Sequence, residues 1–220
     1  MYKDVIVSKP WGYEYLCYKN EYLAIWFLFI NKDNRTSLHC HPNKHTGLVV
    51  LDGIAEVSFL RGSVEIKGLE KIHIFKSRFH STKALSDEGV YLLEEETPED
   101  KHDLLRLEDS YGRENKSYEG AEYERPKDSS CVWLDEPSEN ELEFHGCMIN
   151  HIKPTSKDAL SNFSENDFFI VSRGGVWADK NAIILRPSDV VDGVSLERLL
   201  NSFDIIPEST FIHINKKRNK

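Results

Sequence analysis

The sequence predicts an all-β fold, arranged as a barrel or a sandwich. Short runs rich in aromatic and β-branched residues recur along the first half of the chain, at 11–16, 22–30, 48–51, 55–60, 64–67, 72–75 and 90–95. Turn-forming residues separate these runs, as at 31–34, Gly53, 61–63 and Gly68. Apolar residues in this half show almost no helical spacing. Short strands joined by close turns are typical of a barrel or a sandwich.

The composition limits the classes of function. The chain has 220 residues, enough for one large or two small domains, and its net charge of −9 argues against a nucleic-acid partner. The longest apolar stretch, 22–30, is too short to span a membrane, and the first residues lack the pattern of a signal peptide. Four scattered cysteines without a Cys-x-x-Cys pair indicate reduced thiols. We therefore expect a cytoplasmic protein without membrane attachment.

The pattern changes at Thr97 and Pro98, which predict the start of a helix running through 103–108. Residues 109–128 are polar and charged, as in a linker. Strand-like runs return after Cys131, and the spacing of apolar residues at 195–203 predicts a short amphipathic helix. We therefore expect an N-terminal barrel (1–97), a helical and polar linker (98–130) and a second half (131–220).

Two short blocks of the second half resemble blocks of the first. Residues 49–53 match 170–174, and residues 72–79 match 182–189. This internal repeat predicts that the second half is a copy of the first.

The segment 35–53 contains His39 and His41 directly before a buried run. Alternate residues of a strand point to the same face, so an extended segment directs both imidazoles one way. Two such imidazoles form half of a metal site. A pair of surface histidines in a polar loop is the alternative.

These residues resemble the cupins, whose first motif is His-x-His followed by an acidic residue and a glycine, here Gly53. Their second motif is a short bend that ends in a histidine, here 75–80 with His80, although Phe75 and Ser77 replace the usual proline and glycine. The resemblance implies a double-stranded β-helix, or jelly-roll barrel, with one metal ion bound by His39, His41 and His80. Residues 9–13 and 36–53 are similar to the cupin domain of mannose-6-phosphate isomerase-type proteins, which serve surface-polysaccharide synthesis.

The acidic ligand position of the first motif falls on Thr46, with His45 beside it. Three neutral histidines still suit a divalent ion such as Zn, Fe, Mn or Ni, and His45 is a possible fourth ligand. The alternative is a degenerate site that binds no metal.

Isomerisation of a sugar phosphate moves a proton between neighbouring carbons, which a metal and an acid or base can assist. We take Lys44 and Glu96 as the catalytic candidates, and Glu94 shares the strand face of Glu96. The candidates for binding substrate are Arg78, Arg106, Arg113 and Tyr111.

Aligning the repeat on Gly174 places Leu160 and Asn162 at the positions of His39 and His41, and Val190 at that of His80. The second half is therefore expected to be a degenerate cupin-like barrel without metal, in a bicupin-like chain with a few short helices. A single barrel with a C-terminal extension is the alternative.

The predicted function is that of a metal-dependent cupin acting on a sugar phosphate or related carbohydrate, as an isomerase or epimerase. The alternatives are an Fe(II)-dependent dioxygenase and a sugar-binding cupin without catalysis. By the same resemblance we expect a homodimer.

Overall fold

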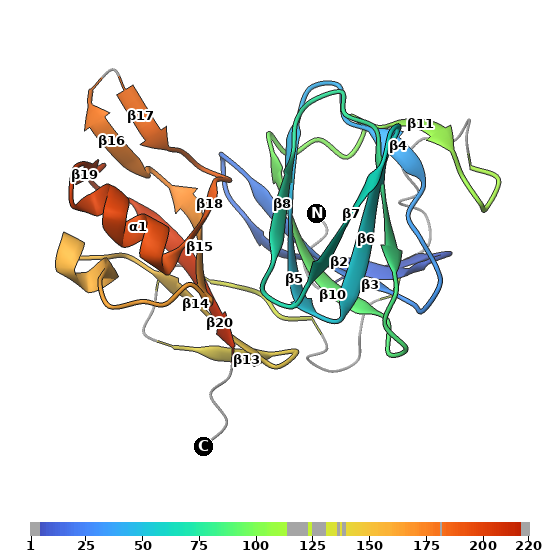
Figure 1. The fold of residues 1–220 in the computed structure, drawn as a ribbon, viewed down its shortest axis with the longest axis horizontal. Coiled ribbons are helices and arrows are strands. Elements are labelled where there is room, and N and C mark those ends of the chain that lie inside the picture. Colours follow the sequence, from blue (N-terminus) through green and yellow to red (C-terminus); the bar gives the residue numbers. More distant parts are fainter. Residues whose placement is uncertain are drawn as a thin grey trace. The chain divides into compact units, whose positions relative to one another are not determined.

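A computed structural model describes residues 5–113, 123–124, 131–135, 137, 140–180 and 182–216. The chain divides into two compact units (Figure 1). The first contains residues 1–19 and 24–133, and the second contains residues 20–23 and 134–220. No helix in the described ranges has the length and apolar character needed to span a membrane.

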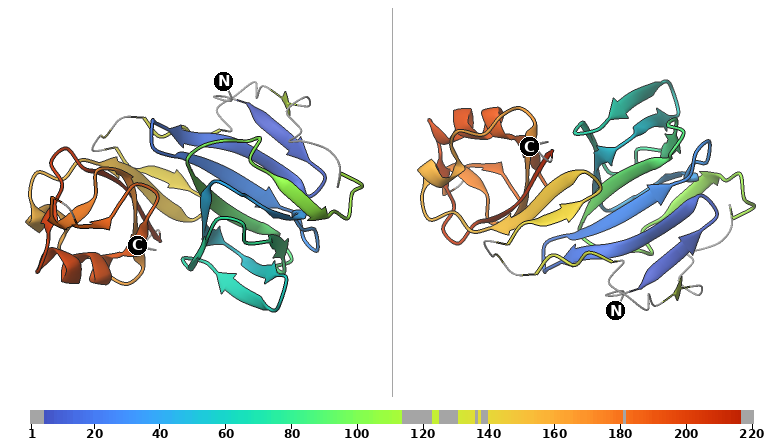
Figure 2. Two further views of the ribbon diagram at one scale, coloured as in Figure 1. Left: turned by 90° about the horizontal axis from the view of Figure 1, so that it is seen from above. Right: turned by 90° about the horizontal axis from the view of Figure 1, so that it is seen from below.

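The first unit consists of two antiparallel sheets. One has the order β12-β1-β2-β3-β10-β5-β8 and the other has the order β11-β4-β9-β6-β7 (Figure 2). The strands are β1 (Ile6–Lys9), β2 (Gly12–Lys19), β3 (Ala24–Ile30), β4 (Leu38–Cys40), β5 (His45–Asp52), β6 (Ile54–Phe59), β7 (Ser63–Lys67), β8 (Lys71–Ile74), β9 (His80–Ala84), β10 (Val90–Thr97), β11 (Leu105–Glu108) and β12 (Tyr123–Glu124).

Eight of these strands form a jelly roll. The chain enters one sheet at β3, crosses to the other at β4, and continues between the sheets until β10 returns beside β3. The resulting orders, β3-β10-β5-β8 and β4-β9-β6-β7, are those of two interlocked Greek keys. The predicted double-stranded β-helix is therefore confirmed.

A cluster of buried apolar side chains fills the interior of the first barrel. The sequence predicts an interior filled by Trp11, Ile25, Phe27, Leu48, Val50, Val57 and Phe59. Trp11, Leu48, Val50 and Val57 do belong to the core cluster, and Phe59 packs against it. The predicted inward direction of Ile25 and Phe27 on β3 is wrong. Trp26 and Leu28 are in this cluster, so Ile25 and Phe27, although fully buried, lie on the opposite face of the strand.

The predicted helix after Thr97 is also wrong. Strand β10 extends to Thr97, and Leu105–Glu108 form β11, which pairs with β4. Backbone hydrogen bonds to the edge of β4 replace those of a helix. Residues 98–113 thus belong to the first unit, whereas 114–122 and 125–130 of the expected linker lie outside the described residues.

The second unit contains one five-stranded and one three-stranded sheet, with the orders β13-β14-β20-β15-β18 and β17-β16-β19. Its elements are β13 (Leu142–Phe144), β14 (Cys147–Ile152), η1 (Lys157–Leu160), β15 (Asp167–Arg173), β16 (Val176–Asp179), β17 (Ala182–Leu185), β18 (Val190–Asp192), α1 (Gly193–Leu200), β19 (Asp204–Ile205) and β20 (Thr210–Lys216). The helix expected at 195–203 is present as α1, and the Asp192 side chain caps it by accepting from the Ser195 amide at 2.8 Å.

The strand order of the second unit repeats that of the first. The sequence β14-β20-β15-β18 corresponds to β3-β10-β5-β8, and β19-β16-β17 corresponds to β9-β6-β7. Strands β5 and β15 both lead into a glycine of positive φ, Gly53 and Gly174, which agrees with the first repeat block. The second block is misaligned, because β17 at 182–185 corresponds to β7 and not to β8.

Candidate metal centre

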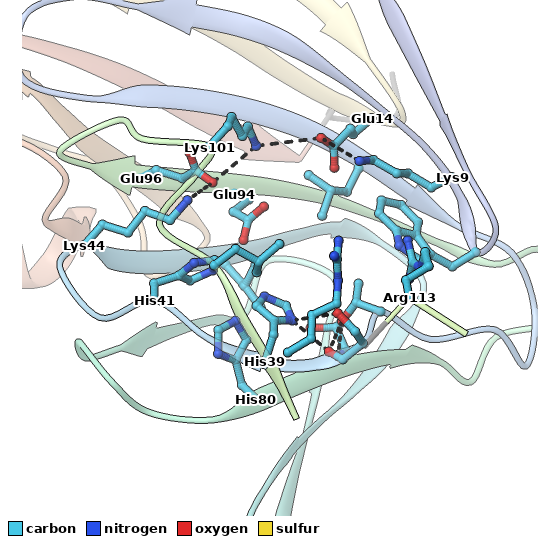
Figure 3. Close-up of a pocket in the computed structure, with 18 residues that line it drawn as sticks. Lys9, Glu14, His39, His41, Lys44, His80, Glu94, Glu96, Lys101 and Arg113 are labelled. Atoms are coloured by element: carbon cyan, nitrogen blue, oxygen red, sulfur yellow. Dashed lines mark hydrogen bonds and ion pairs between the residues drawn. The ribbon is translucent and has the colours of Figure 1, made fainter. Parts of the chain in front are cut away.

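Three histidines meet at one point of the first barrel. His39 lies on β4, His41 follows this strand, and His80 begins β9 directly opposite His39 in the register. Their candidate ligand atoms all lie within 4.8 Å of one another (Figure 3). Two adjacent antiparallel strands thus bring together the ligands that the sequence separates by about forty positions.

The Nδ1 atom of each imidazole ring lies within hydrogen-bond distance of a backbone carbonyl oxygen. The Nδ1 atoms of His39, His41 and His80 lie 2.7, 2.6 and 3.0 Å from the carbonyl oxygens of Ser37, Asp103 and Arg78. A carbonyl oxygen can only accept, so each Nδ1 carries the hydrogen and each Nε2 keeps its lone pair. This tautomer leaves Nε2 as the atom that can bind a metal.

Burial keeps the three rings neutral. It is the largest cause of a lowered pKa at all three histidines, to about 2 for His41 and about 4 for His80, and to well below the usual value for His39. The buried Nε2 atom of His41 has no hydrogen-bond partner within the described part of the chain. Three neutral nitrogen donors, one of them an unsatisfied buried atom, fit a divalent first-row metal.

Charged side chains surround these histidines. The pocket is lined by five cationic residues, Lys9, Lys44, Lys101, Arg106 and Arg113, and by three acidic ones, Glu14, Glu94 and Glu96. Four ion pairs join most of them into a chain (Figure 3). The N–O distances are 3.7 Å for Lys9–Glu14, 3.7 Å for Glu14–Lys101, 3.3 Å for Lys101–Glu96 and 2.8 Å for Glu96–Lys44.

The centre of this chain is strongly polarised. Burial alone raises the pKa of Glu96, but the charges of Lys101 and Lys44 outweigh burial and hold this pKa below the usual value. Burial lowers the pKa of Lys101, yet Glu96 and Glu14 outweigh it, so this pKa is raised. The Lys101 ammonium also lies 3.6 Å from the centre of the Trp26 ring. Glu96 and Lys101 are therefore a stable ionised pair.

Glu94 differs from the other two acidic residues of the pocket. It makes no hydrogen bond or ion pair with any residue that the structure describes. Burial and the neighbouring charge of Glu96 raise the pKa of Glu94 to about 7. A carboxyl group that titrates near neutral pH can both accept and donate a proton there.

Most of the predicted site residues line this pocket. They are His39, His41, His80, Lys44, Glu96, Arg106 and Arg113. Arg78 and Tyr111 are elsewhere: the Arg78 guanidinium lies 4.2 Å from the centre of the Phe59 ring, and the Tyr111 hydroxyl donates to Asn34 Oδ1 at 3.2 Å.

The site also contains residues that the sequence analysis did not select. Lys9, Glu14 and Lys101 belong to no motif of the sequence, and the ion pair between Glu14 and Lys101 joins residues that are far apart in the chain. For Glu94, the alternation with Glu96 was an available signal. The possible fourth ligand, His45, is outside the histidine group and packs against His73 and Phe75, with ring centres 5.5 and 5.9 Å apart.

The second unit differs at the corresponding place. Where β4 lies in the first unit, the second has η1, and Leu160 is fully buried in its apolar core. Among the described residues, the histidine group of the first unit is the one cluster of three potential metal ligands.

No family model and no curated protein sequence matches the chain. The fold is similar to that of KdgF from Halomonas sp. (13% identity, TM-score 0.40, covering 43% of this chain and 86% of that one). It is also similar to the capsular polysaccharide assembling protein CapF from Staphylococcus aureus (16% identity, TM-score 0.43, covering 47% of this chain and 34% of that one). A third similar structure is the cupin domain of Schizosaccharomyces pombe Cnp3 (15% identity, TM-score 0.38, covering 40% of this chain and 64% of that one). The strand order of the first unit is what assigns it as the double-stranded β-helix.

Proposed function

We propose that the first unit is a metal-dependent enzyme that isomerises or epimerises a sugar phosphate or a related polar carbohydrate. The observation that supports this most is the presence, in one pocket, of three converging neutral imidazoles and a carboxyl group, Glu94, that makes no hydrogen bond or ion pair with the described residues. The carbohydrate class comes from the similarity of residues 9–13 and 36–53 to mannose-6-phosphate isomerase-type cupins.

In this proposal His39, His41 and His80 hold one divalent ion, which is Zn, Fe, Mn or Ni. The bound ion supplies a Lewis acid that polarises a substrate carbonyl. The protein contributes the Nδ1–H tautomer, fixed by the three backbone carbonyls, which leaves each Nε2 lone pair free for the ion.

Glu94 is the proton-transfer residue. Its carboxylate takes the proton from the carbon beside the carbonyl, and the carbonyl oxygen becomes the negative oxygen of an enediolate. In an isomerisation the proton is returned to the former carbonyl carbon while the hydroxyl proton of the neighbouring carbon moves to the former carbonyl oxygen. In an epimerisation the original carbon is protonated on its opposite face and the carbonyl re-forms. Lys44 and Glu96, the two catalytic candidates from the sequence, form the adjacent ion pair. Glu96 raises the proton affinity of Glu94, and Lys44 stabilises negative charge that develops on the substrate oxygen.

The cationic wall suits an anionic substrate. The chain carries a net charge of −9, but cationic side chains outnumber acidic ones in the pocket lining. Such a local reversal of charge attracts an anion such as a phosphate group. Arg106 and Arg113, which the sequence analysis selected, and Lys9 are the residues for this role.

Metal analysis of single His→Ala variants tests the metal site. His39→Ala, His41→Ala and His80→Ala should each lose most bound metal, whereas the matched changes of His151 and His213 in the second unit should keep it. Circular dichroism checks that each variant is folded. Full metal content in a folded His41→Ala or His80→Ala protein contradicts the assignment.

Deuterium exchange tests the reaction. Aldose and ketose phosphates are incubated with the metal-loaded protein in D2O, and NMR follows incorporation at the carbon beside the carbonyl. Incorporation that disappears in Glu94→Gln, while metal is retained, supports the proposal. Equal incorporation by wild type and Glu94→Gln contradicts the role of Glu94.

The nitrogen-only ligand set favours one alternative, an Fe(II)-dependent dioxygenase, because three histidines leave positions open for dioxygen and substrate. Anaerobic loading with iron, followed by oxygen-uptake measurements with the same carbohydrates, distinguishes the two reactions. A homodimer stays a prediction, which light scattering on the purified protein tests.

A further inference from the structure

The Asp103 side chain attaches the segment after β10 to the loop that follows β4. Its Oδ2 atom accepts from the amides of Asn43 and Lys44 at 2.8 and 3.0 Å, and its Oδ1 atom accepts from Asn43 Nδ2 at 2.9 Å. The Asp103 side chain is buried. A buried carboxylate with three such bonds defines one position of the segment relative to the loop.

The backbone of the same residue contacts a candidate metal ligand. The Asp103 carbonyl oxygen lies 2.6 Å from His41 Nδ1, the shortest of the three carbonyl contacts at the candidate metal centre. The partners of the other two histidines, Ser37 and Arg78, are each two residues from the histidine that they hold. His41 alone of the three depends on a partner 62 positions away in the chain.

The same attachment also forms part of the pocket wall. Lys44 Nζ donates to the Asp100 carbonyl at 3.2 Å, and β11 continues the attachment along β4. Between these contacts, the segment places Lys101, Leu104 and Arg106 in the pocket lining. The same contacts of residues 100–106 therefore orient His41 and complete the pocket lining.

We infer that Asp103 is a positioning residue that couples attachment of residues 100–106 to metal binding at His41. The inference rests on the metal site of the proposed function. Coupling between two sites is reciprocal, so bound metal must also strengthen attachment of the segment. An outer partner of a metal-bound histidine typically contributes 10- to 100-fold in metal affinity.

A purely local role for Asp103, as the residue that closes the 43–44 turn, predicts a different result. The turn would then lose stability in Asp103 variants, but metal would not change the protection of its amides. Hydrogen exchange at the Asn43 and Lys44 amides separates the two roles, because these amides donate to the Asp103 carboxylate.

The experiment compares wild type, Asp103→Asn and Asp103→Ala. Competition with a chelating indicator measures the Zn²⁺ dissociation constant, and hydrogen exchange with and without Zn²⁺ follows the two amides. The control is Asp167→Asn in the second unit, since Asp167 also accepts from a nearby backbone amide, that of Ser164 at 2.8 Å. Exchange of the β15 amides provides an internal reference.

We expect Asp103→Ala to weaken Zn²⁺ binding 10- to 100-fold, Asp103→Asn to lie between it and wild type, and Asp167→Asn to change it less than twofold. In wild type, Zn²⁺ should slow exchange at Asn43 and Lys44 and leave β15 unchanged. Wild-type affinity in Asp103→Asn and in folded Asp103→Ala overturns the inference, as does exchange at both wild-type amides that does not respond to Zn²⁺. Should Asp103→Ala not fold, Asp103→Asn and the wild-type exchange decide. A wild-type protein that binds no metal refutes the metal site itself and this inference with it.

Discussion

Glu94 and Glu96 lie two residues apart on β10 and face the same pocket, but their surroundings shift their pKa values in opposite directions. Lys44 and Lys101 pair with Glu96, which lowers its pKa, whereas burial and the charge of Glu96 raise that of Glu94. Two carboxyl groups with separated pKa values are the usual arrangement of an acid or base beside a permanently charged group.

Glu94→Gln should stabilise the metal-free protein at alkaline pH. The folded-state pKa of Glu94, about 7, exceeds that of an unfolded glutamate, so its contribution to stability is present at low pH and is lost as pH rises through 7. This pKa shift lowers the free energy of unfolding by about 3 kcal/mol between pH 4.5 and pH 8. Urea unfolding in chelator at both pH values measures the difference, with the exposed Glu88→Gln as control. A difference between wild type and Glu94→Gln that stays constant with pH contradicts the assignment.

Metal affinity should depend little on pH between 6 and 8 in Glu94→Gln, the variant that lacks the pocket carboxyl group with a pKa of about 7. Metal binds neutral imidazole, and burial already keeps the pKa values of His39, His41 and His80 below this range. Three solvent-exposed histidines with an ordinary pKa would lose affinity on the order of 50-fold at pH 6 relative to pH 8. Calorimetric titration of this variant with Zn²⁺ at the two pH values should show less than about a threefold change. A loss like that of exposed histidines means that the rings are not buried as described.

The same pKa shifts predict sensitivity of the metal-free protein to acid. A histidine whose folded-state pKa is lowered contributes stability above the unfolded value of 6.5, and this contribution is lost as pH falls. For His80, with a folded-state pKa of about 4, the loss by pH 4 is about 3 kcal/mol. Urea unfolding of wild type and His80→Gln should therefore converge or cross between pH 7 and pH 4. Parallel curves exclude a buried neutral His80.

The group of His39, His41 and His80 could be predicted from the sequence, because two of these histidines are spaced for one strand face and the third ends a recognisable bend. Which side chains of β3 face the barrel interior could not be predicted. Its sequence, AIWFLFI, is apolar throughout, since both faces of the strand are buried, and alternation then carries no information.

The helix predicted after Thr97 was wrong for a different reason. Pro98 and the apolar residues Leu104, Leu105 and Leu107 are compatible with a helix, but the available edge of β4 determines the observed strand. Because of the incorrect helix, Lys101 was also not predicted as a pocket residue. Its partner Glu96 lies near the end of the preceding strand, β10, and its partner Glu14 lies far away in the chain on β2. The pair with Glu14 depends on the pairing of the strands, which no spacing in a single sequence reveals.

Val50→Ala should destabilise the first barrel by roughly 1–3 kcal/mol, because it removes buried methyl groups and leaves a cavity. Val50 is fully buried in the core cluster, whereas Val64 on β7 is 45% exposed. Val64→Ala is therefore the matched control and should cost less than about 0.5 kcal/mol. Urea unfolding monitored by tryptophan fluorescence measures both. Equal losses in the two variants indicate a wrong strand phase.

Gly12→Ala should be among the most destabilising single changes in the first barrel. Gly12 begins β2 opposite Lys9, and its φ of +152° is unfavourable for any residue with a side chain. A Cβ atom there would lie 1.9 Å from the carbonyl oxygen of Phe29, so the β2–β3 pair would have to separate.

Gly62 provides the matched control for this change. It also has positive φ, +79°, but a Cβ atom there would have no heavy atom within 4 Å. Gly62→Ala therefore carries the backbone cost alone, about 1 kcal/mol, whereas Gly12→Ala should cost at least about 2 kcal/mol more, because the clash is with backbone that cannot rotate away. Urea unfolding of both variants measures the difference. Similar losses show that the opening Pro-Trp-Gly stretch is not packed against β3 as described, and the position of Lys9 in the pocket wall is then also in question.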